Sequence, residues 1–299
     1  MKKLIILEND ILYVEINPIL GGSINNFFIK NKNLKIPVFR KTSNKIIKKN
    51  DILLNSFFSL IPFSGRIANA LLKFKRKTYN LKKNFKGESS ALHGDGWQNS
   101  WVVKNLEKNF VIMKLIVKNK NWPFKYSGYQ IIKINNNELK ISLEIKNLDT
   151  ESMPCGLGFH PWFDMTPNTS LQMNAKKFWI VGKDNLFKKI SNLSKNIDFS
   201  KGKKLINTNL ANGFSEWNGF AKIVWPEKKL SLNIESSKNL KHLIIYTPNK
   251  ENFFCIEPVS HSVDAFNLYA KGVKGTGTKI LRPNKIFKVV TSFKPKITH

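Results

Sequence analysis

Apolar and polar residues follow one another at a spacing of two along much of the chain. The pattern is clear in residues 12–16, 110–117 and 139–145, and further apolar runs occupy residues 242–246, 253–256 and 286–293. A period of two is typical of half-buried β-strands, whereas an amphipathic helix repeats every 3.6 residues. The pattern predicts strands from one end of the chain to the other, with few and short helices.

Polar turns join these runs into hairpins. Residues 131–145 turn around Asn135-Asn136-Asn137-Glu138, and residues 221–234 turn around Pro226-Glu227-Lys228-Lys229. No long Pro-, Gly- or Ser-rich linker divides the chain, and we expect the lysine-rich residues 183–204 to form a solvated excursion. The sequence therefore predicts an all-β, antiparallel single domain over residues 1–299.

Composition supports a globular protein. Hydrophobic residues make up 41% of the 299 positions and aromatic residues 12%, which is enough for a large core and excludes a disordered chain. No run of 18 apolar residues is present, so we expect no membrane span. Glu8 and Asp10 interrupt the first apolar run too early for a secretory signal, and two cysteines provide no disulfide framework. We expect a cytoplasmic protein.

The formal net charge of +30 raises the question of a nucleic-acid partner. The excess is nearly all lysine, with only four arginines, whereas bidentate recognition of phosphates and bases favours arginine. The lysines are also spread along the whole chain. We therefore expect no nucleic-acid partner, although anionic sugars or polyanions stay open as ligands.

Four widely separated segments combine ionisable side chains with aromatic and turn residues. Residues 61–69 hold Arg66 among apolar neighbours, where a guanidinium either forms a structural salt bridge or faces a site. Residues 92–97 hold His93 in a glycine-containing turn beside Trp97. An exposed turn histidine is an equally good interpretation of that pattern.

The other two segments supply a histidine and a glutamate. His160 lies between Phe159 and Pro161, where desolvation lowers a histidine pKa unless a carboxylate compensates, but a hydrogen-bonded core histidine fits as well. Glu257 follows an apolar run and shares a strand face with Cys255. Its carboxyl is either a general base with a raised pKa or one half of an ion pair.

The cysteines and a metal site need separate consideration. Cys155 and Cys255 lie near these ionisable residues, and we expect both to be buried small hydrophobes rather than reactive thiols. His93, His160 and Glu257 are residue types that bind zinc, but no HExxH or comparable spacing supports such a site, so we expect no metal. Neither a phosphate-binding nor a dinucleotide-binding glycine motif is present.

Taken together, the four segments resemble the aldose 1-epimerase family, also called galactose mutarotases. The matching residues are Gly65-Arg66-Ile67-Ala68-Asn69, Leu92-His93-Gly94, Gly158-Phe159-His160-Pro161-Trp162-Phe163, and Glu257-Pro258 through Asn267. The resemblance implies a large β-sandwich of the galactose mutarotase-like (supersandwich) type, an open sugar-binding groove and no cofactor. It also implies an aldohexose substrate and a monomer or homodimer.

The resemblance also implies a role for each residue. Glu257 is similar to the family's base and His160 to its acid, while Arg66 and His93 resemble groups that hold sugar hydroxyls. Further candidates for substrate binding are Asn69, Trp162 and Asn212. Ala211 stands where many relatives carry an Asp that contacts the sugar, so the preferred sugar is in question, and Asn212 substitutes only if the register shifts by one.

Two other functions stay open at this point. The lysine excess favours a sugar-phosphate or acidic-sugar epimerase on the same fold. A non-catalytic carbohydrate-binding or sensing protein would keep the groove without chemistry. The presence of both His160 and Glu257 favours catalysis, because binding alone needs no acid and base pair.

Overall fold

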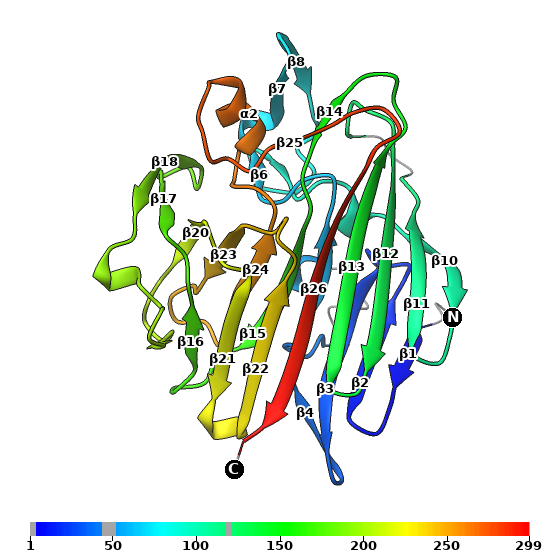
Figure 1. The fold of residues 1–299 in the computed structure, drawn as a ribbon, viewed down its shortest axis with the longest axis vertical. Coiled ribbons are helices and arrows are strands. Elements are labelled where there is room, and N and C mark those ends of the chain that lie inside the picture. Colours follow the sequence, from blue (N-terminus) through cyan, green and yellow to red (C-terminus); the bar gives the residue numbers. More distant parts are fainter. Residues whose placement is uncertain (1–3, 44–51, 118–120, 299) are drawn as a thin grey trace.

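The computed structural model describes residues 4–43, 52–117 and 121–298. Two large antiparallel sheets pack face to face (Figure 1). The strands of the first, eleven-stranded sheet are β1 (Ile5–Glu8), β2 (Leu12–Asn17), β3 (Ser23–Asn31), β5 (Phe57–Leu60), β15 (Gly158–Asp164), β24 (Phe253–Val259), β23 (His242–Tyr246), β20 (Ala211–Ser215), β17 (Lys177–Val181) and β18 (Phe187–Asn192), with β4 (Leu34–Pro37) paired to β3.

The second sheet has nine strands, in the order β10 (Trp101–Leu106), β11 (Phe110–Leu115), β12 (Tyr126–Asn135), β13 (Glu138–Asn147), β26 (Ile286–Ile297), β22 (Leu230–Ser236), β21 (Phe220–Trp225), β16 (Ser170–Met173) and β19 (Lys203–Lys204). The fold class is the predicted one, an all-β antiparallel sandwich.

Smaller elements gather beyond one end of the sandwich, at the top of Figure 1. They are three two-stranded sheets and one α-helix: β6 (Arg66–Ile67) with β9 (Ala91–Leu92), β7 (Leu71–Phe74) with β8 (Lys77–Asn80), β14 (Met153–Cys155) with β25 (Lys279–Leu281), and α2 (Ala265–Ala270). Single 3-10 turns complete the described chain: η1 (Ile52–Leu54), η2 (Ala68–Ala70), η3 (Gly96–Gln98), η4 (Lys195–Ile197) and η5 (Pro226–Lys228).

Alternation along the strands builds the core between the sheets. In β13 every second side chain is buried, from Leu139 to Ile145, as a sheet with one solvated face requires. Phe39 lies at a meeting point of aromatic rings, with centroids 5.0 Å from Phe27 and Phe293. One continuous cluster holds residues from Ile5 to Phe293, so both ends of the chain contribute to it.

The predicted hairpins are confirmed. β12 and β13 pair from Tyr126 to Asn147 around a turn in which Asn136 has φ 49°, a conformation that asparagine tolerates. β21 and β22 are joined through η5, and Lys229 closes that turn with φ 47°.

The lysine-rich excursion is only partly as expected. Most of its side chains are exposed, but the segment contains β18, which pairs with β17. Phe187 and Phe199 are buried, and the Phe187 ring stacks on Trp179 at 5.9 Å. The two phenylalanines anchor a segment whose lysine content alone indicated a solvated loop. In the described part of the chain, no helix is long and apolar enough to span a bilayer.

Candidate active site

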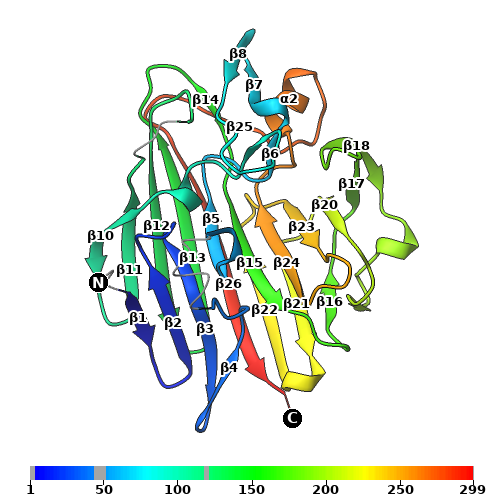
Figure 2. The same ribbon diagram turned by 180° about the vertical axis from the view of Figure 1, so that it is seen from behind.

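The candidate site lies on the outer face of the eleven-stranded sheet. Alternate residues of β15 and β24 point in opposite directions, so Phe159 and Phe254 join the main core. Trp162 and Cys255 instead belong to a separate cluster on the other face of the sheet. This outer face is the one turned toward the viewer in Figure 2, where β15 and β24 run side by side.

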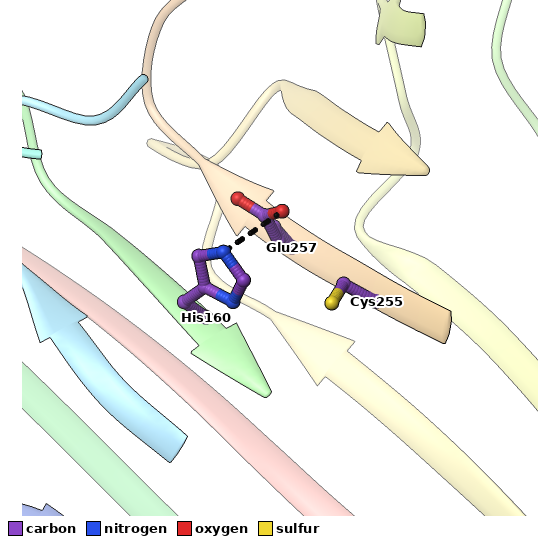
Figure 3. Close-up of side chains that lie close together, drawn as sticks. All are labelled: His160, Cys255 and Glu257. Atoms are coloured by element: carbon purple, nitrogen blue, oxygen red, sulfur yellow. Dashed lines mark ion pairs between the residues drawn. The ribbon is translucent and has the colours of Figure 1, made fainter. Parts of the chain in front are cut away.

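Strand register brings His160 and Glu257 together. In the pairing of β15 with β24, Gly158 faces Val259 and Trp162 faces Cys255, which puts His160 directly opposite Glu257. Cross-strand neighbours have Cβ atoms about 4.5–5.5 Å apart, so their side chains meet. Figure 3 shows the ring and the carboxyl turned toward one another, with His160 Nε2 3.4 Å from Glu257 Oε1.

Burial sets the protonation of this pair. Desolvation raises the pKa of Glu257 to about 8, against a smaller lowering by the Arg66 charge. Desolvation also lowers the pKa of His160 to about 3, and Arg40 contributes in the same direction. Glu257 does not compensate as a carboxylate would, because the same burial keeps its carboxyl protonated. Near neutral pH the pair therefore holds a single proton.

Aromatic rings enclose His160. Its cross-strand neighbour in β5 is Phe58, whose ring stacks on the imidazole with centroids 4.6 Å apart. Trp162, two residues along β15, stacks on it at 5.3 Å. These contacts fix the ring plane and exclude water, which explains the low histidine pKa.

His93 reaches the site from the turn after β9. It has φ 56°, and its backbone N–H donates to Gly65 O at 2.8 Å. The Gly65 N–H donates to His93 Nδ1 at 3.1 Å, so the proton of the neutral ring is assigned to Nε2. Burial lowers the pKa of His93 well below its usual value, with His160 as a further cause. His93 is thus a neutral hydrogen-bond donor, rather than the exposed turn histidine of the alternative interpretation.

Arg66 lies in β6 and forms a bidentate pair with Glu88. Its Nη2 is 2.6 Å from Glu88 Oε1 and its Nε is 3.1 Å from Glu88 Oε2. Both side chains also line the cavity described below. The two interpretations of Arg66 are therefore compatible, since the salt bridge is itself part of the site wall.

Residues that follow Glu257 in the chain form hydrogen bonds with the segment around Arg66. Ser64 N–H donates to His261 Nε2 at 3.1 Å, and Ala68 N–H donates to Asp264 Oδ1 at 3.0 Å. Asp264 N–H in turn donates to Arg66 O at 2.9 Å. The polar residues that follow Glu257 thus hold the Arg66 segment beside the end of β24.

These residues surround one cavity of about 320 Å³, within the range usual for small-molecule sites. Five predicted site residues line it: Arg66, His93, His160, Trp162 and Glu257. The other lining residues are Leu53, Gly65, Phe85, Glu88, Leu92, Asn185, Phe187, Ala211, Ile244, Tyr246 and Val263.

Asn69 and Asn212 are not among the lining residues. Asn69 is exposed on η2 with φ 54°, and the Asn212 amide donates to Trp179 O at 3.2 Å. Their assignment to substrate binding stays a prediction. Ala211 itself faces the cavity, so in this structure the register does not shift in favour of Asn212.

Three residues of the candidate site and its surroundings could not be identified from the sequence. Phe58 is one of 22 phenylalanines, and only the β5–β15 register places it on His160. Glu88 lies in a lysine-rich loop with no neighbouring motif. Arg40 packs its guanidinium 4.2 Å from the Trp162 ring centroid and is distant from it in sequence. Long-range packing, not local pattern, brings all three to the site.

The group of possible metal ligands in the structure differs from the one considered from the sequence, because it contains Cys255. In the described residues, His160, Cys255 and Glu257 bring one ligand-type atom each to within 4.8 Å of the others, whereas the trio considered from sequence had His93 in place of the cysteine. Burial raises the pKa of the Cys255 thiol well above its usual value, and metals bind the thiolate. Without a metal the thiol is therefore protonated, and the absence of a metal at this group stays a prediction.

Comparisons with known proteins give matches in both sequence and fold. Residues 3–294 match the family model described as aldose 1-epimerase. The uncharacterised protein YphB of Escherichia coli K12 is 27% identical over 217 residues, which cover 70% of this chain and 74% of YphB.

Solved structures share the fold over nearly the whole chain. A crystal structure from Escherichia coli K12, named as a candidate aldose 1-epimerase, has a TM-score of 0.87 and 23% identity and covers 99% of both chains. A galactose mutarotase-like protein from Clostridium acetobutylicum has a TM-score of 0.84 and 20% identity, covering 99% of this chain and 96% of its own.

Proposed function

The chain belongs to the aldose 1-epimerase family, and from this premise we propose that it interconverts the α and β anomers of an aldohexose by acid–base-catalysed ring opening and closure. The observation that carries the proposal is the contact of His160 Nε2 with Glu257 Oε1 at 3.4 Å on the wall of a sugar-sized cavity. An acid and a base this close can act on two oxygens bonded to the same carbon atom.

The proposed reaction moves one proton on and one proton off the sugar. The Glu257 carboxylate takes the proton of the anomeric hydroxyl, His160 donates its proton to the ring oxygen, and the bond between that oxygen and the anomeric carbon breaks. The resulting aldehyde rotates about its bond to the next carbon. Closure on the opposite face returns both protons, and each such transfer typically gives about 10²–10⁴-fold acceleration.

The number of protons on the pair is compatible with this scheme, although the empty cavity favours the other arrangement of the proton. The reactive form has a carboxylate and an imidazolium, whereas the empty cavity favours a protonated Glu257 and a neutral His160. Both forms contain one shared proton, and its passage from Oε1 to Nε2 interconverts them. The rate should therefore vary little across neutral pH and fall above about 8, when the shared proton is lost.

The other wall residues would position the sugar. His93 can donate from Nε2 to a hydroxyl, and Arg66 has N–H groups beyond the two that contact Glu88. Trp162 provides an aromatic face of the kind that packs against sugar C–H groups. These roles require no cofactor.

The experiment is polarimetry of freshly dissolved aldohexoses with and without the protein. We expect the approach to anomeric equilibrium to accelerate in proportion to protein concentration for at least one hexose. If a hexose quenches tryptophan fluorescence but none equilibrates faster, the protein is a sugar-binding module and the proposed catalysis is wrong.

A further inference from the structure

Charge in the cavity differs from charge on the chain as a whole. The chain has a net charge of +30, yet none of the described residues that line the cavity is a lysine. Among the lining residues that the structure describes, Arg66 alone has a permanent positive charge, and the Glu88 carboxylate contacts it through two nitrogen–oxygen pairs, at 2.6 and 3.1 Å. The cation that an anionic ligand would seek is therefore already neutralised.

The loop between β8 and β9 holds this carboxylate in place. Gly87 has φ 85°, a left-handed conformation that favours glycine, and the Glu88 N–H donates to Phe85 O at 3.2 Å across the turn. Asn84 anchors the loop to β9, because its amide group accepts from Leu92 N–H and donates to Leu92 O, both at 2.7 Å. The Glu88 carboxylate is thus held by its loop as well as by Arg66.

We propose that Glu88 is a specificity-determining residue: it cancels the Arg66 charge, holds the guanidinium in one orientation, and restricts the cavity to uncharged aldoses. This inference rests on the proposed function. A neutral hydroxyl can share the remaining Arg66 N–H groups and the Glu88 oxygens at no electrostatic cost. A phosphate or carboxylate on the sugar would meet a paired cation and a like charge, which opposes binding.

The surface lysines do not override this local arrangement. At physiological ionic strength the Debye length is about 8 Å, so exposed charges farther away are largely screened, whereas the Arg66–Glu88 pair contacts the ligand space directly. A basic surface steers anions toward the protein, but the cavity wall decides which sugar is retained.

The test compares an aldohexose with its 6-phosphate and its uronic acid. The quantity measured is the ratio of kcat/KM for the anionic sugar to kcat/KM for the neutral one, by NMR exchange between anomers with the uncatalysed rate subtracted. Glu88→Gln should raise this ratio about tenfold or more, because it leaves the Arg66 charge without a counter-charge while keeping the side-chain shape. Glu88→Asp keeps the charge and should leave the ratio near that of the parent.

Glu235→Gln is the matched control. Glu235 pairs with Lys294 at 2.5 Å on the second sheet, so its substitution changes the net charge equally but outside the cavity. The ratio should stay within about twofold of the parent, since a distant exposed charge is screened. An unchanged ratio in Glu88→Gln, or an equal rise in Glu235→Gln, would overturn the proposal.

The parent protein tests the inference without any variant. If it processes the 6-phosphate as efficiently as the free hexose, Glu88 does not restrict charge. A binding assay with tryptophan fluorescence as its readout separates the two proposals. It measures the preference for neutral sugars, and the loss of that preference in Glu88→Gln, even if the protein equilibrates no sugar. Absence of catalysis with that preference intact would refute only the proposed function.

Discussion

Replacement of Glu257 by Gln should remove the proposed base and stabilise the protein relative to the parent, by an amount that grows as pH rises. The carboxyl is buried, and its pKa is about 8 in the folded protein against 4.5 for an ordinary glutamate. A raised folded-state pKa means that the folded protein binds the proton more tightly than the unfolded chain. Stability from this group is then fully present below about pH 4.5 and is lost as pH rises toward about 8.

The size of the effect follows from the two pKa values. Each pKa unit corresponds to about 1.36 kcal/mol. Relative to the fully protonated carboxyl, ionisation lowers the free energy of unfolding by about 1 kcal/mol at pH 5 and about 3 kcal/mol at pH 7. The Gln variant has no such dependence. Relative to the parent it should therefore gain about 2 kcal/mol between these two pH values, or about 4 °C in Tm for a chain of 299 residues.

Urea unfolding of both proteins at pH 5 and pH 7 measures this difference. Any constant contribution from the new amide cancels between the two pH values, and so does the titration of His160, which both proteins share. Glu235→Gln is again the control, because it removes no buried carboxyl and its difference from the parent should not change with pH. A Glu257→Gln difference that is equally flat would refute the desolvation argument.

Three further predictions concern other parts of the molecule. Burial raises the pKa of Asp95 to about 6, so Asp95→Asn should gain about 2 kcal/mol on the parent between pH 4 and 7; a loss in urea titrations would contradict this. Phe39→Ala should cost about 3–5 kcal/mol in unfolding free energy, because it empties the centre of the aromatic core. Ala211→Asp should change relative mutarotation rates among hexose epimers, and an unchanged profile would count against its assigned place in the cavity wall.

The sequence was most informative about local structure. Alternation at residues 139–145 and the polar turn around Asn136 are enough to predict β13 and its hairpin from local sequence. Residues 183–204 show the limit, because burial of Phe187 depends on Trp179 and not on its lysine neighbours. Where a segment is held by long-range packing, local composition predicts its surroundings poorly.

In the candidate site, too, local properties could be predicted from the sequence, whereas contacts between distant residues could not. Residue type and strand alternation correctly indicated desolvation of His160 and Glu257, since both lie on apolar strands. Their shared proton depends on the register of β15 against β24, which no local pattern contains. The Arg66–Glu88 pair likewise joins residues 22 positions apart through a loop whose path is set by Gly87 and Asn84.

The most direct test of the acid–base account is the mutarotation rate of four proteins under one condition: the parent, His160→Asn, Glu257→Gln and the double variant. Each single substitution should lower the rate by roughly 10²-fold or more, with unfolding curves showing that the fold is retained. The double variant should be little slower than the poorer single, because the two residues serve one step. A near-parental rate in either single variant, or losses that multiply in the double variant, would contradict the proposed pairing of His160 with Glu257.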